Sequence, residues 1–388
     1  MTKKLLFDLL SAQPYGNTKF HGGGEYIKTV LKKLLEDYSE FIKIEVFYDK
    51  TKFLDEWLLE IISLKRVLVY DVDNINDVER ILNLNNFDIF YSGLPYTYTE
   101  KMFPKSIKKI GTFHGLRPIE CPGDDYKFAY INGNGIKNKI KKLLYSVYWS
   151  RNFLNERLKH RYKVQYIEAF RTFDKCIVVS EHTKYAVSNY FQEYGGKIEV
   201  CYSPAKESDI KQLSDVIKCR YILIISADRW LKNSYRALCA LDDMYERNLL
   251  GDIKVVVVGV QDNNFFKVVK NRSNFQFKNY VTAEELEALY KNCSVFLYPT
   301  LNEGFGYPPL EAMKYGRTCV VSAVCSLPEI CGEAVYYINP YDLGEMQTRI
   351  LEALENPISE DVILLQRNKI LHRQNLDLEK LCEIIADK

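Results

Sequence analysis

The chain has 388 residues, 47% of them hydrophobic and 27% charged, an ordinary composition for a globular protein of about two domains. A formal net charge of +2 argues against a protein that coats nucleic acid. The ten cysteines include no CxxC pair and no common zinc spacing, so we expect reduced thiols and a cytoplasmic location.

The first half of the chain alternates short apolar runs with helical patterns. Residues 4–10 are interrupted by Asp8 and are too short for a signal peptide, so they predict a strand. Gly22-Gly23-Gly24 opens a helix at about 25–37. Further strands are expected at 42–48, 66–70, 87–91, 109–113 and 175–179. No segment has the ~18 apolar residues that a membrane span needs.

A polar stretch at 203–214 predicts a linker, and a second series of strands follows it. These strands are expected at 221–226, 253–259, 275–277, 295–298, 318–322 and 334–338, and 359–388 should be helical. The alternation indicates an α/β protein with two doubly wound, Rossmann-like domains. Ligands of such domains bind beyond the carboxyl ends of the strands.

Residues 302–329, NEGFGYPPLEAMKYGRTCVVSAVCSLPE, are the most informative stretch of the chain. Glu303 and Glu311 bracket a glycine turn between a short apolar strand and a helix predicted at 310–315. Free amides at a helix N-terminus favour an anion, and glycines let backbone approach a ligand closely. Carboxylates can accept hydrogen bonds from hydroxyl groups. An anion together with a polyol suggests a nucleotide sugar.

The spacing EGFGYPPLE, followed by EAMKYG and SAVCSLPEICGEAVYYINPYD, resembles the signature of the retaining glycosyltransferases of family four, or glycosyl transferases group 1. That family has the GT-B fold, with two Rossmann-like domains and a deep cleft. The resemblance implies an acceptor-side domain at 1–205 and a nucleotide-sugar-binding domain at 206–370. It also implies a C-terminal helix at 371–388 that crosses back to the first domain.

The same resemblance implies roles for the residues of the glycine turn. Glu303 is expected to contact the donor sugar, and Glu311 the ribose hydroxyls. The backbone amides of Phe305, Gly306 and Tyr307 are expected to meet the sugar and the phosphates. The alternative is a strand–helix corner with two solvated acids.

Two more stretches are expected to bind the donor. Arg229 and Lys232 directly follow a predicted strand, where two cations can neutralise a diphosphate. Family members place an Arg and a Lys in this loop, although here the Arg is displaced from its usual positions. Backbone at Tyr280 and Val281 is expected to recognise the base edge. The neighbouring Thr282 and its third following residue, Glu285, also predict a helix capping box.

In the first half, the resemblance selects His114 and the glycines at 22–24. His114 follows a predicted strand and is expected to hydrogen-bond the donor sugar or support the transition state. Gly23 and Gly24 are expected to approach the diphosphate and the acceptor. The glycine triplet does not match the GxGxxG fingerprint, because Ile27 occupies the third position. A plain helix-entry loop is the alternative.

Two stretches have weaker signals. Asp71-Val72-Asp73 has the form of a DxD metal motif, but a polar loop explains it better, and no metal or other cofactor is expected. Residues 135–163 carry many Lys and Arg and a single acid, Glu156, with interleaved aromatics. This segment either makes peripheral contact with an anionic membrane or is an ordinary helix with a solvated basic face.

Taken together, these patterns predict a glycosyltransferase that moves a hexose, of mannose or rhamnose type, from a nucleoside diphosphate sugar to an acceptor hydroxyl. The donor is expected to be GDP-, UDP- or dTDP-linked, the acceptor a glycan or a lipid-linked glycan, and the pathway cell-surface polysaccharide synthesis. A sugar-nucleotide epimerase and an inactive GT-B scaffold are the alternatives. A phosphorylase would need a pyridoxal lysine and a longer chain.

Overall fold

The computed structural model describes residues 2–14, 21–130, 136–149, 153–205, 217, 219–260 and 268–388. The chain divides into two compact units, each built around one parallel sheet. Unit 1 comprises Met1–Leu116, Arg161–Glu207 and Leu371–Lys388, and unit 2 comprises Arg117–His160 and Ser208–Ile370. Residues 117–160 therefore group with the second unit, whereas the sequence assigned them to the first domain. Most of the predicted linker at 203–214 lies outside the described residues.

Unit 1 contains a seven-stranded sheet in the order β3-β2-β1-β4-β5-β6-β7, with every pair parallel. Its strands are β1 (Lys3–Asp8), β2 (Ile42–Tyr48), β3 (Leu68–Asp71), β4 (Ile89–Ser92), β5 (Lys108–Phe113), β6 (Lys175–Val178) and β7 (Ile198–Val200). The central strands are buried along most of their length, as expected for a sheet covered on both faces.

The helices that accompany this sheet are α1 (Gly22–Lys33), α2 (Glu56–Leu64), α3 (Ile75–Leu84), α6 (Phe153–Thr172) and α7 (Glu181–Tyr190). A π-helical turn at Leu34–Tyr38 extends α1, and short 3-10 turns occupy Leu10–Ala12, Pro95–Thr97, Glu100–Met102 and Gln192–Lys197. Helix α6 begins in the part of the chain that groups with unit 2.

Unit 2 contains a six-stranded sheet in the order β10-β9-β8-β11-β12-β13, again with every pair parallel. Its strands are β8 (Tyr221–Ile224), β9 (Lys254–Val258), β10 (Phe275–Lys278), β11 (Val295–Tyr298), β12 (Cys319–Ser322) and β13 (Tyr336–Ile338). Its helices are α4 (Arg117–Glu120), α5 (Ile136–Trp149), α8 (Ser234–Glu246), α9 (Ala283–Asn292), α10 (Tyr307–Met313), α11 (Leu327–Cys331) and α12 (Leu343–Glu355). The 3-10 turns of this unit are η5 (Asp125–Tyr130), η7 (Trp230–Lys232) and η9 (Arg272–Asn274).

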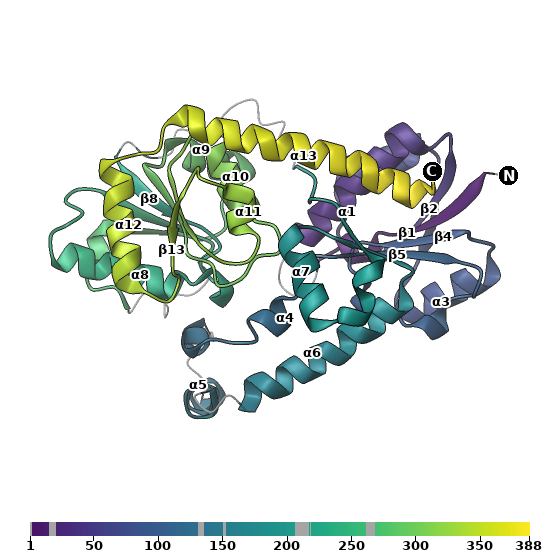
Figure 1. Cartoon of the computed structure of the whole chain (residues 1–388), viewed down its shortest axis with the longest axis horizontal. Coiled ribbons are helices and arrows are strands. Elements are labelled where there is room, and N and C mark those ends of the chain that lie inside the picture. Colours follow the sequence, from purple (N-terminus) through teal and green to yellow (C-terminus); the bar gives the residue numbers. More distant parts are fainter. Residues whose placement is uncertain are drawn as a thin grey trace. The chain divides into compact units, whose positions relative to one another are not determined.

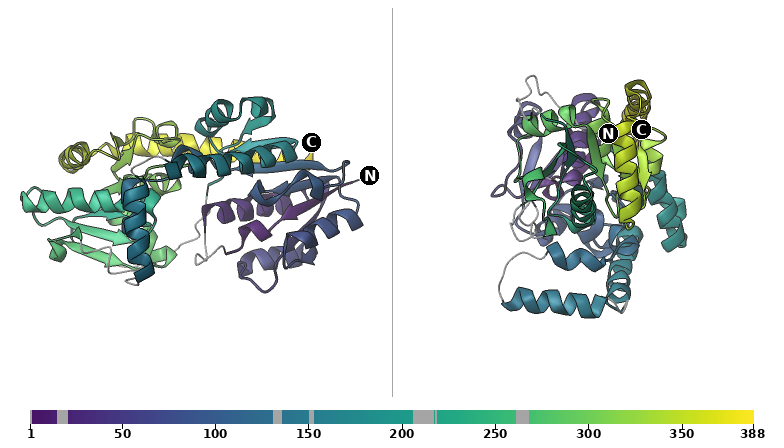
Figure 2. Two further views of the ribbon diagram at one scale, coloured as in Figure 1. Left: turned by 90° about the horizontal axis from the view of Figure 1, so that it is seen from below. Right: turned by 90° about the vertical axis from the view of Figure 1, so that its left-hand side faces the viewer.

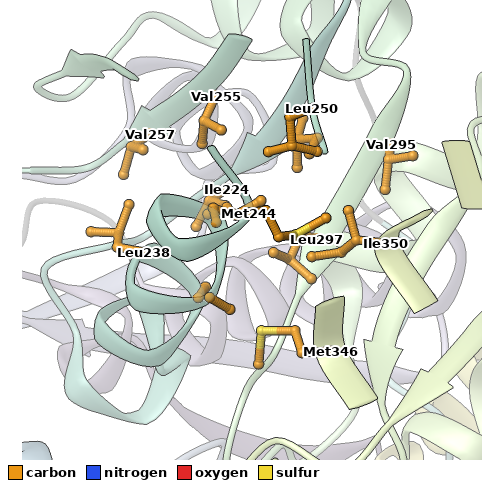
Figure 3. Close-up of a cluster of buried hydrophobic side chains, with 14 of the residues drawn as sticks. Ile224, Leu238, Met244, Leu250, Val255, Val257, Val295, Leu297, Met346 and Ile350 are labelled. Atoms are coloured by element: carbon orange, nitrogen blue, oxygen red, sulfur yellow. The ribbon is translucent and has the colours of Figure 1, made fainter. Parts of the chain in front are cut away.

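The core of unit 2 forms where α8 and α12 pack on one face of the sheet (Figure 3). Leu238 and Met244 of α8 meet Val255 and Val257 of β9, and Ile350 of α12 packs against the same cluster. Adjacent strand residues of β9, such as Val256, are buried as well, because helices cover the opposite face. This double coverage fixes the strand ends from which the functional loops emerge.

Helix α13 (Glu360–Ala386) is one continuous helix at the end of the chain (Figure 1). Its first part groups with unit 2 and its last part with unit 1. In unit 1, Gln374 donates to the carbonyl of Ser203 at 2.7 Å, and Asp377 accepts from the Tyr202 amide at 2.9 Å. Within the described ranges, no helix is both long enough and apolar enough to cross a bilayer.

Candidate active site

The candidate site lies in unit 2, where two loops leave the carboxyl ends of neighbouring strands. Strands β8 and β11 pair directly, so the loop that contains η7 and the loop at 299–306 start side by side. The amide of Leu301 donates to the carbonyl of Leu231 at 2.8 Å, and the Thr300 hydroxyl donates to the same oxygen at 3.0 Å. These bonds fix the position of one loop against the other.

Lys232 and Glu303 form a buried ion pair between these loops. Only 8% of Lys232 and 7% of Glu303 is exposed. The Lys232 ammonium donates to Glu303 Oε1 and to the Tyr298 hydroxyl, and that hydroxyl donates to Glu303 Oε1 at 2.6 Å. The pair therefore has a third, buried partner that holds the carboxylate in one orientation.

Burial and the surrounding charges shift the pKa values of both members of this pair. Burial, followed by the charges of Arg229 and Arg117, lowers the pKa of Lys232 to about 8 despite the attraction of Glu303. Burial alone would raise the pKa of Glu303, but the charges of Lys232 and Arg117 outweigh burial and lower it to about 2. Glu303 is therefore ionised at neutral pH, and Lys232 is a cation with two arginines near it.

A cavity of about 370 Å³ opens beside the pair, and unit 2 alone supplies its lining. Its lining residues are Arg117, Lys127, Tyr130, Asp228, Arg229, Trp230, Leu231, Lys232 and Asn302. Four of these are cations and one is an acid. Even when Glu303 is counted with Asp228, the cations outnumber the carboxylates by two, which suits a ligand with two negative charges.

The segment at 117–130 contributes to the cavity because α8 holds it in place. Asp124 and Arg236 form a buried salt bridge at 2.9 Å, which ties the segment to α8. The amide of Tyr235 donates to the hydroxyl of Tyr130 at 2.7 Å, and the rings of Tyr126 and Tyr235 stack with centroids 4.7 Å apart. The positions of Arg117 and Lys127 are therefore set by packing within unit 2.

Two acceptor oxygens at the cavity have no hydrogen-bond partner in the described part of the chain. They are Oδ1 of Asn302 and Oδ1 of Asp228, and both atoms are buried. The Asn302 amide nitrogen donates to Glu120 at 3.1 Å, and the other Asp228 oxygen accepts from Tyr280 at 3.2 Å. Buried acceptors of this kind favour a ligand that brings hydroxyl or N–H donors.

The glycine turn has the backbone geometry that the sequence suggested. Gly306 has φ of +113°, and a Cβ there would lie 2.7 Å from the side chain of Leu327, so only glycine fits. The Ser326 hydroxyl donates to the Phe305 carbonyl at 2.7 Å and so fixes the turn from behind. Helix α10 begins at Tyr307, ahead of its two prolines and earlier than the 310–315 range predicted from sequence.

Tyr280 and Val281 follow β10 and Glu311 follows β11, two strands that β9 and β8 separate in the sheet. Glu311 is on α10 and accepts a hydrogen bond at 2.7 Å from the hydroxyl of Tyr290, which lies on α9. Tyr280 and Val281 sit between β10 and α9, and Tyr280 is largely exposed. The predicted capping box at the start of α9 is confirmed, since the Thr282 hydroxyl accepts from the Glu285 amide at 3.2 Å and the Glu285 carboxylate accepts in return.

His114, Gly23 and Gly24 lie in unit 1, also beyond the carboxyl ends of strands. His114 follows β5, and its Nε2 is 3.0 Å from the carbonyl of Gly93, so a neutral ring with Nε2–H leaves Nδ1 unprotonated. Gly24 has a local reason to be glycine, because a Cβ would lie 2.8 Å from the carbonyl of Ala12. The Gly24 amide also donates to Nδ1 of His21, the residue that caps α1.

The residues of the two weaker sequence signals are not among the lining residues of this cavity. Asp71 ends β3 at the edge of the sheet in unit 1 and accepts from the Lys50 amide at 2.9 Å, while Asp73 lies in an exposed turn. Residues 135–163 comprise α5 and the first half of α6, except that residue 135 and residues 150–152 lie outside the described residues.

Sequence reasoning missed Arg117, Lys127, Asp228 and Asn302 as lining residues. Arg117 stands three residues after His114, and Asp228 directly precedes Arg229, so proximity to selected residues was the available signal. Lys127 had no such signal, because its position depends on the packing of 117–130 against α8.

Comparison with known proteins finds one family model and several relatives that match parts of the chain. Residues 205–369 match the family model of glycosyl transferases group 1. The serotype-specific mannosyltransferase WbdA of Escherichia coli is 42% identical over 82 residues, which are 21% of this chain and 10% of that protein. The O-antigen chain mannosyltransferase RfbU of Salmonella typhimurium is 27% identical over 188 residues, 47% of this chain and 52% of that protein. The chain thus spans between a tenth and about half of the length of these curated relatives.

Solved structures match over the whole chain. A glycosyltransferase from Rickettsia africae superposes with a TM-score of 0.62 at 16% identity, covering 99% of this chain and 98% of that one. Anabaena Alr3699/HepE, solved with UDP and glucose, superposes with a TM-score of 0.63 at 12% identity and covers 100% of both chains. In fold, the protein is of the GT-B class. Its residues 205–369 are similar to the glycosyl transferases group 1 family, whose model they match.

Proposed function

We propose that this protein transfers a hexose from a nucleoside diphosphate sugar to an acceptor hydroxyl, with retention of anomeric configuration. The observation that carries the proposal is the cavity beside the Lys232–Glu303 pair, with its excess of two positive charges. The diphosphate of a nucleotide sugar carries two negative charges, so donor and site are complementary.

The chemistry follows from where charge develops. When the bond to the sugar breaks, negative charge grows on the departing diphosphate, and fixed cations stabilise it without reorganisation. Lys232 and Arg229 would take this role, and the amides of Phe305, Gly306 and Tyr307 would add hydrogen bonds. Because Glu303 is ionised and held by Tyr298, it is suited to accept hydrogen bonds from sugar hydroxyls.

The remaining expected residues complete the proposed donor site. Glu311 would bind the ribose hydroxyls and backbone at Tyr280 and Val281 the base edge. His114 and the amides of Gly23 and Gly24 would act from unit 1 on the donor sugar and the diphosphate. We propose that no metal is required, since side-chain cations neutralise the diphosphate.

The mannosyltransferase relatives favour a mannosyl donor and a role in cell-surface polysaccharide synthesis. The donor would be GDP-, UDP- or dTDP-linked, and the acceptor would be a glycan or a lipid-linked glycan. A lipid-linked acceptor would bring residues 135–163 to an anionic membrane surface.

The first test is a thermal-shift panel of GDP, UDP, ADP and dTDP with their common sugars. A nucleotide that binds only the folded state raises the melting temperature, so one clear responder names the base. Product anomers read by NMR then test retention. Turnover of the donor without acceptor would favour an epimerase, and no response to any nucleotide at millimolar concentration would favour an inactive scaffold.

A further inference from the structure

Helix α5 carries a stripe of exposed aliphatic side chains. Exposed fractions are 77% for Ile136, 51% for Ile140, 65% for Leu143 and 47% for Leu144. At 100° per residue these four positions fall within an arc of about 100°, which makes them one face of the helix. Solitary exposed leucines are ordinary in proteins, but four on one helical face form a continuous apolar surface.

Two lysines flank this stripe, one on each side. Lys137 and Lys139 are exposed, and helical geometry puts them about 20° and 40° beyond the edges of the aliphatic arc. The charge around the stripe is one-sided, since the sequence has no Asp or Glu between Asp125 and Glu156. An apolar face bordered by cations matches a surface that is apolar inside and anionic outside.

The stripe does not pack against the sheet of unit 2. Helix α5 packs on η5 of the same unit and is not among the helices that cover the β8–β13 sheet (Figures 1 and 2). In the described part of the chain, the four aliphatic side chains therefore keep roughly half or more of their surface in contact with solvent.

We infer that α5 docks the protein on an anionic lipid surface. The helix lies in the plane of the interface, with Ile136, Ile140, Leu143 and Leu144 below the headgroups. The stems of Lys137 and Lys139 run along the apolar boundary, and their ammonium groups meet lipid phosphates. This inference rests on the membrane contact proposed above for residues 135–163, and it concerns a surface that does not line the cavity.

The test is co-sedimentation of the full chain with vesicles of phosphatidylcholine alone and of phosphatidylcholine with phosphatidylglycerol. We expect binding to the anionic vesicles only. The double variant Ile140→Glu/Leu143→Glu should lower the partition coefficient by at least about tenfold, because it places charge in the apolar stripe. Replacing Lys137 and Lys139 with serine should cost about fivefold for each lysine removed.

Leu84→Glu is the matched control, because Leu84 is 76% exposed on α3, outside this surface. It should bind vesicles like the unaltered chain. Circular dichroism and nucleotide binding report that each variant is folded. The inference is overturned if the chain ignores anionic vesicles, if it binds both lipid compositions equally, or if the stripe variants bind as the control does. It is also overturned if the stripe variants abolish only self-association, since the stripe would then join copies of the chain.

Discussion

The carboxylate of Glu303 and the ammonium of Lys232 share the hydroxyl of Tyr298, and all three groups are buried. The strands β8 and β11 are neighbours in the sheet, which brings residues 71 positions apart in sequence into direct contact. Removing one member of a buried ion pair leaves an unpaired charge at a cost of about 3–5 kcal/mol. Mutational tests must therefore separate the loss of charge from the loss of folding.

The neutral double variant Lys232→Met/Glu303→Gln makes this separation. It removes both charges at similar volume, so we expect a melting temperature close to that of the unaltered protein. Turnover should fall by about 100- to 1,000-fold or more, because the charge that develops on the leaving diphosphate would lose one of the cations that line the cavity. Lys232→Arg retains the charge and should keep part of the activity. Near-normal turnover in the double variant would remove Lys232 from the diphosphate role.

The pH dependence of turnover should report on Lys232. Its pKa is about 8 in the free protein, below the usual lysine value, so the cation is lost as pH rises through 8. We expect kcat/KM for the donor to fall above pH 8, since this ratio reflects the free enzyme. In kcat the same limb should lie at higher pH, because a bound diphosphate favours the protonated amine.

The control for this profile is Lys232→Arg, which stays charged throughout the range and should lack the alkaline limb. The contribution of Lys232 to folding stability should change with pH in the opposite direction to turnover. A lysine whose pKa is depressed by folding destabilises the folded protein while charged, so its contribution improves as pH rises from 8 toward the unfolded value. A fall in activity that parallels thermal unfolding would contradict the assignment.

Arg117 should strengthen donor binding even though it lies outside the region matched by the family model. Its charge lowers the pKa of Glu303, which shows that it acts on the same group as Lys232. Arg117→Ala should raise the donor KM about tenfold with a smaller effect on kcat, as expected when a charge-assisted contact is lost. Arg367→Ala, at a partly exposed position on α13 outside the cavity lining, is the matched control. Equal donor KM values in the two variants would exclude Arg117 from the donor site.

Much of the strand pattern was predictable because the central strands are buried on both faces, which makes strands such as β8, β9 and β11 continuous apolar runs. The ranges 42–48 and 295–298 agree with β2 and β11 residue for residue. The edge strand β7 has three residues and was missed, since so short a run carries little periodicity. The GT-B fold followed from the glycine turn and its flanking motifs.

The surroundings of the site were less predictable. The pairing of Lys232 with Glu303 depends on strand order, and the entry of 117–130 depends on the buried Asp124–Arg236 bridge. A local pattern specifies neither of these long-range contacts. Asn279 stands where the family usually has glycine, and its φ is not positive, so the backbone here does not require a glycine.

Chelation is the test of a metal requirement. Since Lys232 and Arg229 line the cavity proposed for the diphosphate, we expect activity to survive EDTA largely unchanged, because these side chains would supply the positive charge. The assay should use protein dialysed against chelator. Abolished activity that Mn²⁺ or Mg²⁺ restores would contradict this expectation and direct attention to Asp71 and Asp73, whose replacement by asparagine would then be the next measurement.

Glu311 should discriminate nucleotides by their ribose. Its carboxylate is positioned by the Tyr290 hydroxyl and would accept hydrogen bonds from the 2′- and 3′-hydroxyls. Glu311→Ala should weaken binding of the preferred nucleoside diphosphate about 10- to 100-fold, the range for hydrogen bonds to a charged group. Its effect on the 2′,3′-dideoxy analogue should be small, because that analogue lacks both donors. Tyr290→Phe keeps the carboxylate but removes the hydroxyl that positions it, so it should weaken nucleotide binding less, in the same direction.

Calorimetry measures the affinity of the unaltered protein, Glu311→Ala and Tyr290→Phe for the hydroxylated and the dideoxy nucleotide. Equal losses for the hydroxylated and the dideoxy nucleotide would show that Glu311 acts through the fold and does not bind the ribose.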